Sequence, residues 1–106
     1  MLCAQFIFRA GERDEDYYRL HKVISEFCAS IDGFIGVERW VATEGDLRNS
    51  CYYFETMEGI QALAAFSGHQ EAKGQYKRWY EGYQIVISQV VKTYGDGGIV
   101  TLAKDR

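Results

Sequence analysis

The pattern of hydrophobic and polar positions predicts a strand and then a long helix at the start of the chain. Residues 2–10 alternate strictly, which is typical of a strand buried mainly on one side. From residue 17 to residue 31, hydrophobic side chains recur three and four positions apart, which is the period of a helix. Acidic residues directly before this stretch favour a helix N-terminus, and Asp32-Gly33 ends the helix.

Two further strands are predicted in the middle of the chain. Residues 34–43 and 49–57 alternate again, and the turn residues 44–46 between them indicate a hairpin. In the first of these strands, the alternation predicts one face with Phe34, Gly36, Glu38 and Trp40 and an opposite face with Ile35, Val37, Arg39 and Val41.

A pair of helices and a long strand complete the pattern. A short helix is expected around residues 60–66, and the spacing of Ser67 and Gln70 matches a capping box that starts a second helix. Residues 83–93 form the last predicted strand. Residues 99–102 could add an edge strand or pack on a partner.

The order of these elements predicts an α+β protein with ferredoxin-like β-α-β-β-α-β topology, an antiparallel sheet and helices on one of its faces. The 106 residues leave room for a single domain, with a core at about residues 2–95 and a short C-terminal tail at 96–106. In a monomer the other face of the sheet would be apolar and exposed, so we expect a homodimer.

Composition and charge exclude several classes of protein. The chain is 47% hydrophobic and 25% charged, which is ordinary for a globular protein. Its net charge is −3 and it has no basic stretch, so we expect no nucleic-acid partner. It shows no signal-peptide pattern and no apolar run of membrane-spanning length, so we expect a cytoplasmic protein without a membrane partner.

The cysteines and histidines give no sign of a metal site. Cys3, Cys28 and Cys51 are widely spaced without a CxxC motif, and we expect reduced, buried thiols. His21 and His69 are too far apart for a zinc-binding pair. The chain also has no P-loop, dinucleotide or local nucleophile motif. The sequence therefore predicts neither a metal nor a cofactor.

Several motifs resemble the antibiotic biosynthesis monooxygenase superfamily of dimeric α+β barrels. They are Ile31-Asp32-Gly33-Phe34-Ile35-Gly36, the strand ending in Trp40, Tyr52-Tyr53-Phe54-Glu55, Phe66-Ser67-Gly68-His69-Gln70-Glu71-Ala72-Lys73 and Trp79-Tyr80-Glu81-Gly82-Tyr83. The resemblance covers roughly residues 2–95. It implies a homodimer with a pocket between the helices and the sheet of each protomer. Some members oxidise polycyclic or quinol-like phenols with dioxygen, without a metal or flavin; others degrade haem, isomerise small metabolites or have no known activity.

Cofactor-free oxygenation requires a base that removes a phenolic proton inside an apolar pocket. His69, at the start of the second helix of the pair, is the candidate catalytic residue; the alternative is a surface or capping histidine. Aromatic residues make up 15% of the chain, more than a small core needs. The candidate pocket lining is Trp40, Tyr53, Tyr76, Trp79 and Tyr83, and the alternative is packing in the core and dimer interface.

Two polar residues have competing interpretations. Arg39 could hold an anionic group of the substrate, or it could form a cross-strand ion pair with Glu55. His21 lies on the apolar stripe of the first helix, where a buried histidine bonded to a backbone carbonyl is expected. Haem degradation is disfavoured, because residues 74–77 contain no histidine where haem-degrading members of the superfamily place their ligand.

The resulting hypothesis is a dimeric, cofactor-independent monooxygenase that acts on a small aromatic or quinol-type compound. The alternative is a non-catalytic dimer of the same fold that binds a small ligand or is associated with stress. Fold alone does not separate the two, because function resides in the site.

Overall fold

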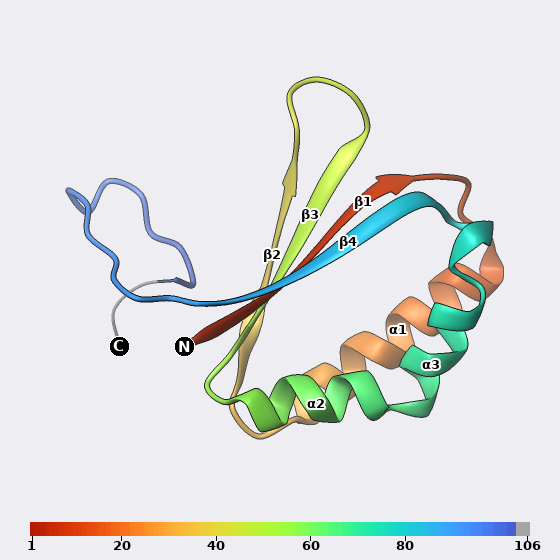
Figure 1. The fold of residues 1–106 in the computed structure, drawn as a ribbon, viewed down its shortest axis with the longest axis horizontal. Helices are drawn as coiled ribbons and strands as arrows, with labels where there is room; N and C mark the ends of the chain where they lie inside the picture. Colours follow the sequence, from red (N-terminus) through yellow and green to blue (C-terminus); the bar gives the residue numbers. More distant parts are fainter. Residues whose placement is uncertain (104–106) are drawn as a thin grey trace.

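One antiparallel sheet of four strands forms a layer of the protein, and the helices cover one of its faces (Figure 1). The computed structural model describes residues 1–103, so the last three residues of the predicted tail lie outside the described residues. The strands are β1 (Leu2–Ala10), β2 (Phe34–Val41), β3 (Leu47–Phe54) and β4 (Tyr80–Gln89), in the spatial order β2-β3-β1-β4. The helical segments are α1 (Glu15–Ser30), α2 (Met57–Ala65), α3 (Ser67–Gly74) and the 3₁₀ turn η1 (Tyr76–Arg78). The predicted ferredoxin-like α+β topology is confirmed.

Strand β1 lies inside the sheet and pairs with both β3 and β4. Its alternation is as predicted: Leu2 and Ala4 pack against the core beneath the helices, whereas Cys3 belongs to a cluster on the opposite face. Successive side chains of a strand point to opposite faces, so this assignment fixes the faces of β3 and β4 through their register with β1.

Strand β2 contains a bulge that the alternation did not predict. Phe34 pairs with Phe54, but the next pair joins Gly36 to Tyr53, so β2 has one extra residue at this point. Phe34 therefore packs with the core under the helices, while Trp40 falls on the other face of the sheet. The predicted common face of Phe34 and Trp40 is wrong, because the bulge reverses the alternation between them.

The boundaries of α3 and β4 also differ from the prediction. Ser67 is the first residue of α3 and does not cap it, and no side chain caps this helix. The Gln70 side chain instead donates a hydrogen bond to the carbonyl oxygen of Ala64 at 2.6 Å, so the capping-box prediction is wrong. Strand β4 begins earlier than predicted, because Ala10 pairs with Tyr80 beyond a bulge.

The core between the sheet and the helices is an apolar cluster around Phe54, which is fully buried. Its ring meets the edge of the Phe34 ring at 5.3 Å between centroids. Helix α2 approaches this ring closely, since a Cβ atom at Gly59 would lie 2.8 Å from it. The buried members of the cluster are Cys28, Phe54, Ile60 and Leu63.

The opposite face of the sheet carries a smaller buried cluster of Cys3, Cys51 and Tyr53. The chain after β4 returns to this face, where Leu102 packs against the cluster. The Leu102 N–H donates a hydrogen bond to Oε2 of Glu38 at 2.9 Å. Residues 99–102 have no strand structure, so the predicted edge strand is wrong; within this segment Leu102 packs on the protein's own sheet, whereas Ile99 and Val100 are exposed.

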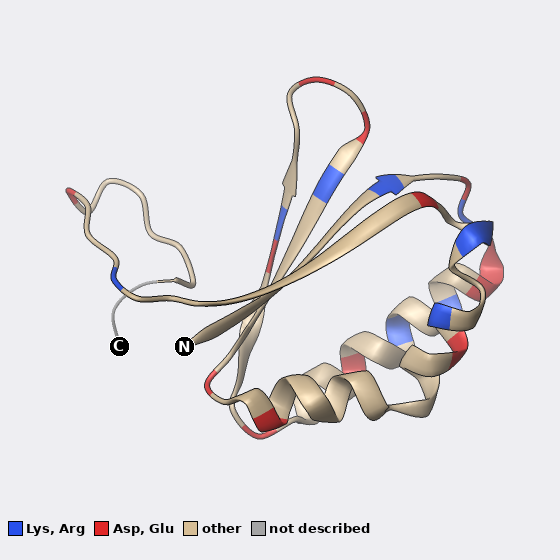
Figure 2. Ribbon diagram, in the orientation of Figure 1, with Lys and Arg blue, Asp and Glu red and all other residues tan. Residues whose placement is uncertain are grey.

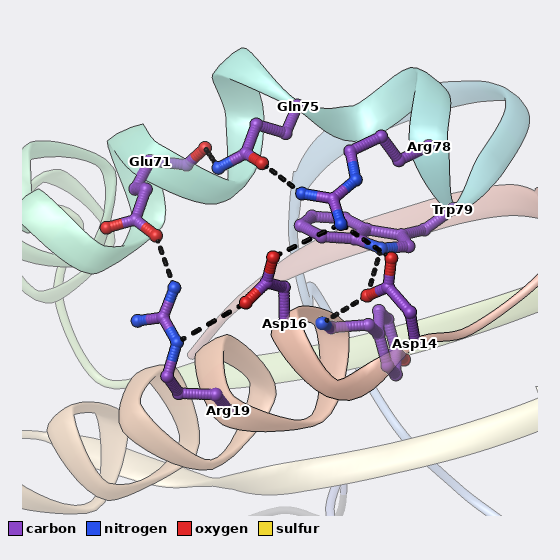
Figure 3. A network of polar contacts seen from close by, with 8 residues as sticks. Asp14, Asp16, Arg19, Glu71, Gln75, Arg78 and Trp79 are labelled. Atoms are coloured by element: carbon purple, nitrogen blue, oxygen red, sulfur yellow. Dashed lines mark hydrogen bonds and ion pairs between the residues drawn. The ribbon is translucent and has the colours of Figure 1, made fainter.

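A polar network joins the start of α1 to η1 (Figure 3). One carboxylate oxygen of Asp14 accepts a hydrogen bond from the Tyr17 N–H at 2.9 Å and so caps α1. The same carboxylate accepts hydrogen bonds from Trp79 Nε1 at 2.9 Å and from the Arg78 guanidinium at 2.7 Å. A second ion pair, between Arg19 and Glu71 at 2.7 Å, joins α1 to α3. The network holds α3 and η1 against α1.

Candidate functional site

The sheet and the helix layer diverge toward the turn between β2 and β3 (Figure 1), and a cavity of about 630 Å³ lies between them. Its walls are residues of all four strands on one side and of α1, α2, α3 and η1 on the other. This volume is typical of a site for a small organic molecule.

Six of the seven predicted site residues border this cavity: Arg39, Trp40, His69, Tyr76, Trp79 and Tyr83. Tyr53 does not, because it is buried in the cluster on the opposite face of the sheet. Trp40 is a special case, since its pairing with Asn49 directs its side chain to that opposite face, where it is 53% exposed. The structure thus brings five of the seven side chains together on the helix side.

His69 lies in the first turn of α3 and is half-buried in the cavity wall. Its Nδ1 atom is buried and has no hydrogen-bond partner among residues 1–103. Burial lowers the pKa of His69, and the positive charge of Lys73 acts in the same direction, while the carbonyl oxygen of Ala64 opposes both. The imidazole is therefore neutral at pH 7, which leaves a ring nitrogen able to accept a proton.

Aromatic rings form the sheet side of the cavity near β1 and β4. Phe6 stacks on Phe8 at 4.9 Å between ring centroids and meets the ring of Tyr80 edge-on at 5.2 Å. Tyr76 of η1 meets Tyr83 edge-on at 4.9 Å. Burial raises the pKa of Tyr80, so its phenol stays protonated at neutral pH. These rings can hold a flat apolar molecule and shield it from water.

The wall formed by α1 and β2 is polar, and its central pair is His21 and Arg39. A guanidinium nitrogen of Arg39 lies 3.4 Å from Nε2 of His21. Because a guanidinium only donates, Nε2 is the acceptor, and the proton of the neutral ring is on Nδ1. Burial, followed by the charges of Arg39 and Arg13, lowers the pKa of His21, although part of its ring is exposed.

The structure distinguishes between the interpretations of His21 and Arg39. His21 is not a buried histidine bonded to a backbone carbonyl; its ring reaches Arg39 instead. Among the described residues, Arg39 forms no ion pair with Glu55, which follows β3 and lies beside Gly33. Arg39 thus remains available to a ligand in the cavity.

Tyr52 is a cavity residue that the sequence reasoning missed. It pairs with Ala4 on the helix side of the sheet, next to Arg39, and burial raises the pKa of its phenol. The alternation of side chains in β3 contained the information needed to find it. Once Phe54 is assigned to the core, alternation places Tyr52 on the same face as Phe54 and Tyr53 on the opposite face.

No group of three or more histidine, cysteine or acidic side chains within residues 1–103 is arranged to hold a metal ion. In the same part of the chain, no helix has the length and hydropathy needed to cross a bilayer.

Comparison with solved structures relates this fold to antibiotic biosynthesis monooxygenase proteins. SnoaB, a cofactor-independent oxygenase from Streptomyces nogalater, superimposes with a TM-score of 0.70 at 9% identity, over 90% of this chain and 97% of SnoaB. A candidate antibiotic biosynthesis monooxygenase from Deinococcus radiodurans gives a TM-score of 0.66 at 12% identity, over 92% of this chain and all (100%) of that chain.

A further candidate monooxygenase of this kind, from Nitrosomonas europaea, gives a TM-score of 0.64 at 11% identity, over 87% of this chain and 100% of that chain. No protein-family model matches the sequence, and no curated protein matches it. The chain therefore has the fold of the antibiotic biosynthesis monooxygenases, as the sequence motifs implied, and at these identities the likeness concerns the fold.

Proposed function

We propose that this protein is a cofactor-independent monooxygenase that acts on a small aromatic or quinol-type compound. One observation carries the proposal: His69, whose buried Nδ1 has no hydrogen-bond partner among the described residues, borders a cavity whose walls are rich in aromatic rings. A buried polar atom without a partner costs free energy unless a ligand satisfies it, so it indicates a functional position. The shared fold with a cofactor-independent oxygenase supports the same reaction class.

In the proposed reaction, His69 takes a proton from a phenolic hydroxyl of the substrate. The resulting anion is electron-rich and transfers electrons to dioxygen in the cavity. One oxygen atom forms a bond to a ring carbon, whose single hydrogen is lost, and this carbon and the phenolic carbon become the two carbonyls of a quinone; the ring hydrogen and the phenolic proton held by His69 pass to the second oxygen atom. The other oxygen atom leaves as water, so the substrate supplies both electrons of the second oxygen's reduction and no external reductant is consumed.

The remaining predicted side chains have supporting roles in this proposal. Tyr76, Trp79 and Tyr83 form the apolar walls that orient the ring and exclude water. Arg39 faces the same space from β2 and stabilises negative charge on the bound compound. On the other face of the sheet, the exposed Trp40 is assigned to packing between protomers, and Tyr53 belongs to the buried cluster of its own protomer.

The test of the proposed function is oxygen uptake by the purified, metal-stripped protein with hydroquinones, anthrones and catechols. Uptake above the rate of autoxidation, and its loss in His69→Ala, is the expected result. If no compound in the panel gives enzyme-dependent uptake, the monooxygenase proposal fails, and the non-catalytic ligand-binding dimer becomes the better description.

We also propose that the protein is a cytoplasmic homodimer that pairs through the sheet face opposite the helices. Trp40 is 53% exposed on this face. A second copy would cover the indole. Sedimentation equilibrium should give twice the 12.2 kDa chain mass, and Trp40→Glu should shift the protein to monomer.

A further inference from the structure

The side chains around the cavity are unbalanced in charge. The chain as a whole is acidic, with 15 Asp and Glu against 12 Lys and Arg. Within residues 1–103, no acidic residue borders the cavity, whereas four basic residues do, namely Arg13, Arg39, Arg48 and Lys73. Figure 2 shows basic positions on both β2 and β3, in the part of the sheet that leads to their turn. The described charged side chains around this cavity are therefore all basic, although the chain as a whole is acidic. A positive potential in an apolar cavity favours an anionic ligand.

Arg39 is the best placed of these cations. Its register opposite Ser50 puts it on the helix side of the sheet, and its guanidinium reaches across to Nε2 of His21 at 3.4 Å. No carboxylate in the described part of the chain lies within 4.0 Å of it. By contrast, Arg19 and Arg78, outside the cavity, each pair with a carboxylate at 2.7 Å.

The neighbours of Arg39 hold it in position without neutralising its charge. His21 accepts a hydrogen bond from Arg39 through a neutral ring, and the phenol of Tyr52, whose pKa is raised by burial, is a second neutral neighbour. The guanidinium fork can form two parallel hydrogen bonds to a carboxylate, a geometry that lysine cannot match. Arg39 is thus oriented, charged and free to bind an anion.

The distance across the sheet limits the size of the ligand. Arg39, Ser50 and Phe6 occupy one row on three adjacent strands, on the helix side. Neighbouring strands are about 4.8 Å apart, so the β1 backbone at Phe6 lies roughly 10 Å from the β2 backbone at Arg39. A carboxylate on Arg39 therefore places an attached ring of one or two fused cycles over Ser50 and Phe6, beside Tyr80.

We propose that the ligand of this cavity is an aromatic carboxylate, and that Arg39, held by His21 and Tyr52, binds its carboxylate group. The inference rests on the proposed function for the reaction and adds the class of substrate, a phenol or quinol that bears a carboxylate. His69 and Arg39 then serve different groups of one molecule, since they project from α3 and from β2, respectively.

The experiment compares binding of 1-naphthoate and 1-naphthamide to the full-length protein by isothermal titration calorimetry. The two compounds have nearly the same shape, differ in charge and carry no phenol, so binding is measured without oxidation. We expect 1-naphthoate to bind at least about 10-fold more tightly, the factor that a charge-assisted pair supplies. Arg39→Gln should abolish this preference while leaving 1-naphthamide binding within about 2-fold, and Arg39→Lys should retain part of it.

Arg9→Gln is the matched control, because it makes the same change of charge at an exposed residue outside the cavity. It should leave binding of both compounds unchanged. Equal or undetectable binding of the two compounds, or a preference that survives in Arg39→Gln, would overturn the inference. The protein could also prefer the carboxylate through Arg39 and yet show no oxygen uptake with any compound. That result would support this inference and reject only the monooxygenase function.

Discussion

Trp79 Nε1 donates a hydrogen bond of 2.9 Å to Oδ1 of Asp14, a residue 65 positions earlier in the chain (Figure 3). The same oxygen caps α1 through the Tyr17 N–H, and Arg78 binds the second oxygen. Trp79 is 2% exposed and forms part of the cavity wall. One carboxylate thus fixes the start of a helix and the position of a cavity residue together.

Asp14→Ala should therefore destabilise the protein more than Asp14→Asn. Alanine removes the helix cap and leaves the buried indole N–H of Trp79 without its acceptor, whereas asparagine is an equally good cap and retains an acceptor oxygen. We expect thermal unfolding, followed by circular dichroism, to give a melting temperature several degrees lower for Asp14→Ala than for Asp14→Asn. Equal melting temperatures would mean that the ion pair with Arg78 is the main contribution of Asp14.

The charge of Asp14 also predicts a pH dependence of stability. The hydrogen bond from the Tyr17 N–H, followed by those from Trp79 and Arg78, lowers the pKa of Asp14 in the folded protein. A lowered pKa gives a stabilisation that is fully present above the unfolded value, roughly 4, and is lost as the pH falls through the folded value. Between pH 7 and about pH 3, the urea midpoint of the wild type should fall further than that of Asp14→Asn. Parallel curves for the two proteins would contradict this assignment.

His69→Ala should reduce turnover at least about 100-fold if His69 is the base, with little change in melting temperature. Because burial and Lys73 lower the pKa of His69, the neutral form should persist below the ordinary histidine value of about 6.5. The acid limb of the kcat profile should accordingly lie below pH 6.5, and Lys73→Gln should move it to higher pH. A loss of activity below 10-fold in His69→Ala, or an acid limb above pH 7, would remove His69 from this role.

The sequence was sufficient to predict the fold because alternation and helical period are local. Residues 2–10 alternate without interruption, and the structure has a strand there, with Leu2 and Ala4 on the face toward the helices. The change of period at residue 17 likewise located α1. Each of these patterns depends on side chains a few positions apart, so a single sequence contains the information.

The site was predicted less well because it depends on long-range register. The bulge between Phe34 and Gly36 places Arg39 toward the helices and Trp40 away from them, the reverse of what unbroken alternation would give. His21 and Arg39 lie next to each other because α1 packs on β2. No local pattern in the sequence predicts this contact. Aromatic content indicated a pocket, but only the strand pairing determines which rings enter it.

Two glycines offer a matched pair of substitutions with opposite expected effects. A Cβ atom at Gly11 would lie 2.9 Å from the carbonyl oxygen of Trp79, which accepts the Gly11 N–H at 2.7 Å, so Gly11→Ala must displace the chain beside the cavity. We expect it to lower the free energy of unfolding by about 1–3 kcal/mol. Gly74, at the end of α3, has no neighbour within 4 Å of such an atom, and Gly74→Ala should stabilise by about 0.5–1 kcal/mol. Chemical denaturation measures both, and destabilisation by both substitutions to the same extent would contradict the contact at Gly11.

The three cysteines should be unreactive in the native protein. All are free and buried, and burial raises the pKa of Cys3 and of Cys28 to about 11, from an ordinary value of 9.0. The thiolate is the reactive form, so this difference alone lowers its population at pH 8 by about 100-fold relative to the unfolded chain. We expect the disulfide reagent DTNB to react with the native protein at least about 100-fold more slowly than with protein in guanidinium chloride, where all three thiols should react. A single thiol that reacts rapidly under native conditions would show that one cluster opens to solvent. If that thiol is Cys28, it should react faster in Gly59→Ala than in the wild type, because a Cβ atom at Gly59 would lie 2.8 Å from the Phe54 ring that packs in the same cluster.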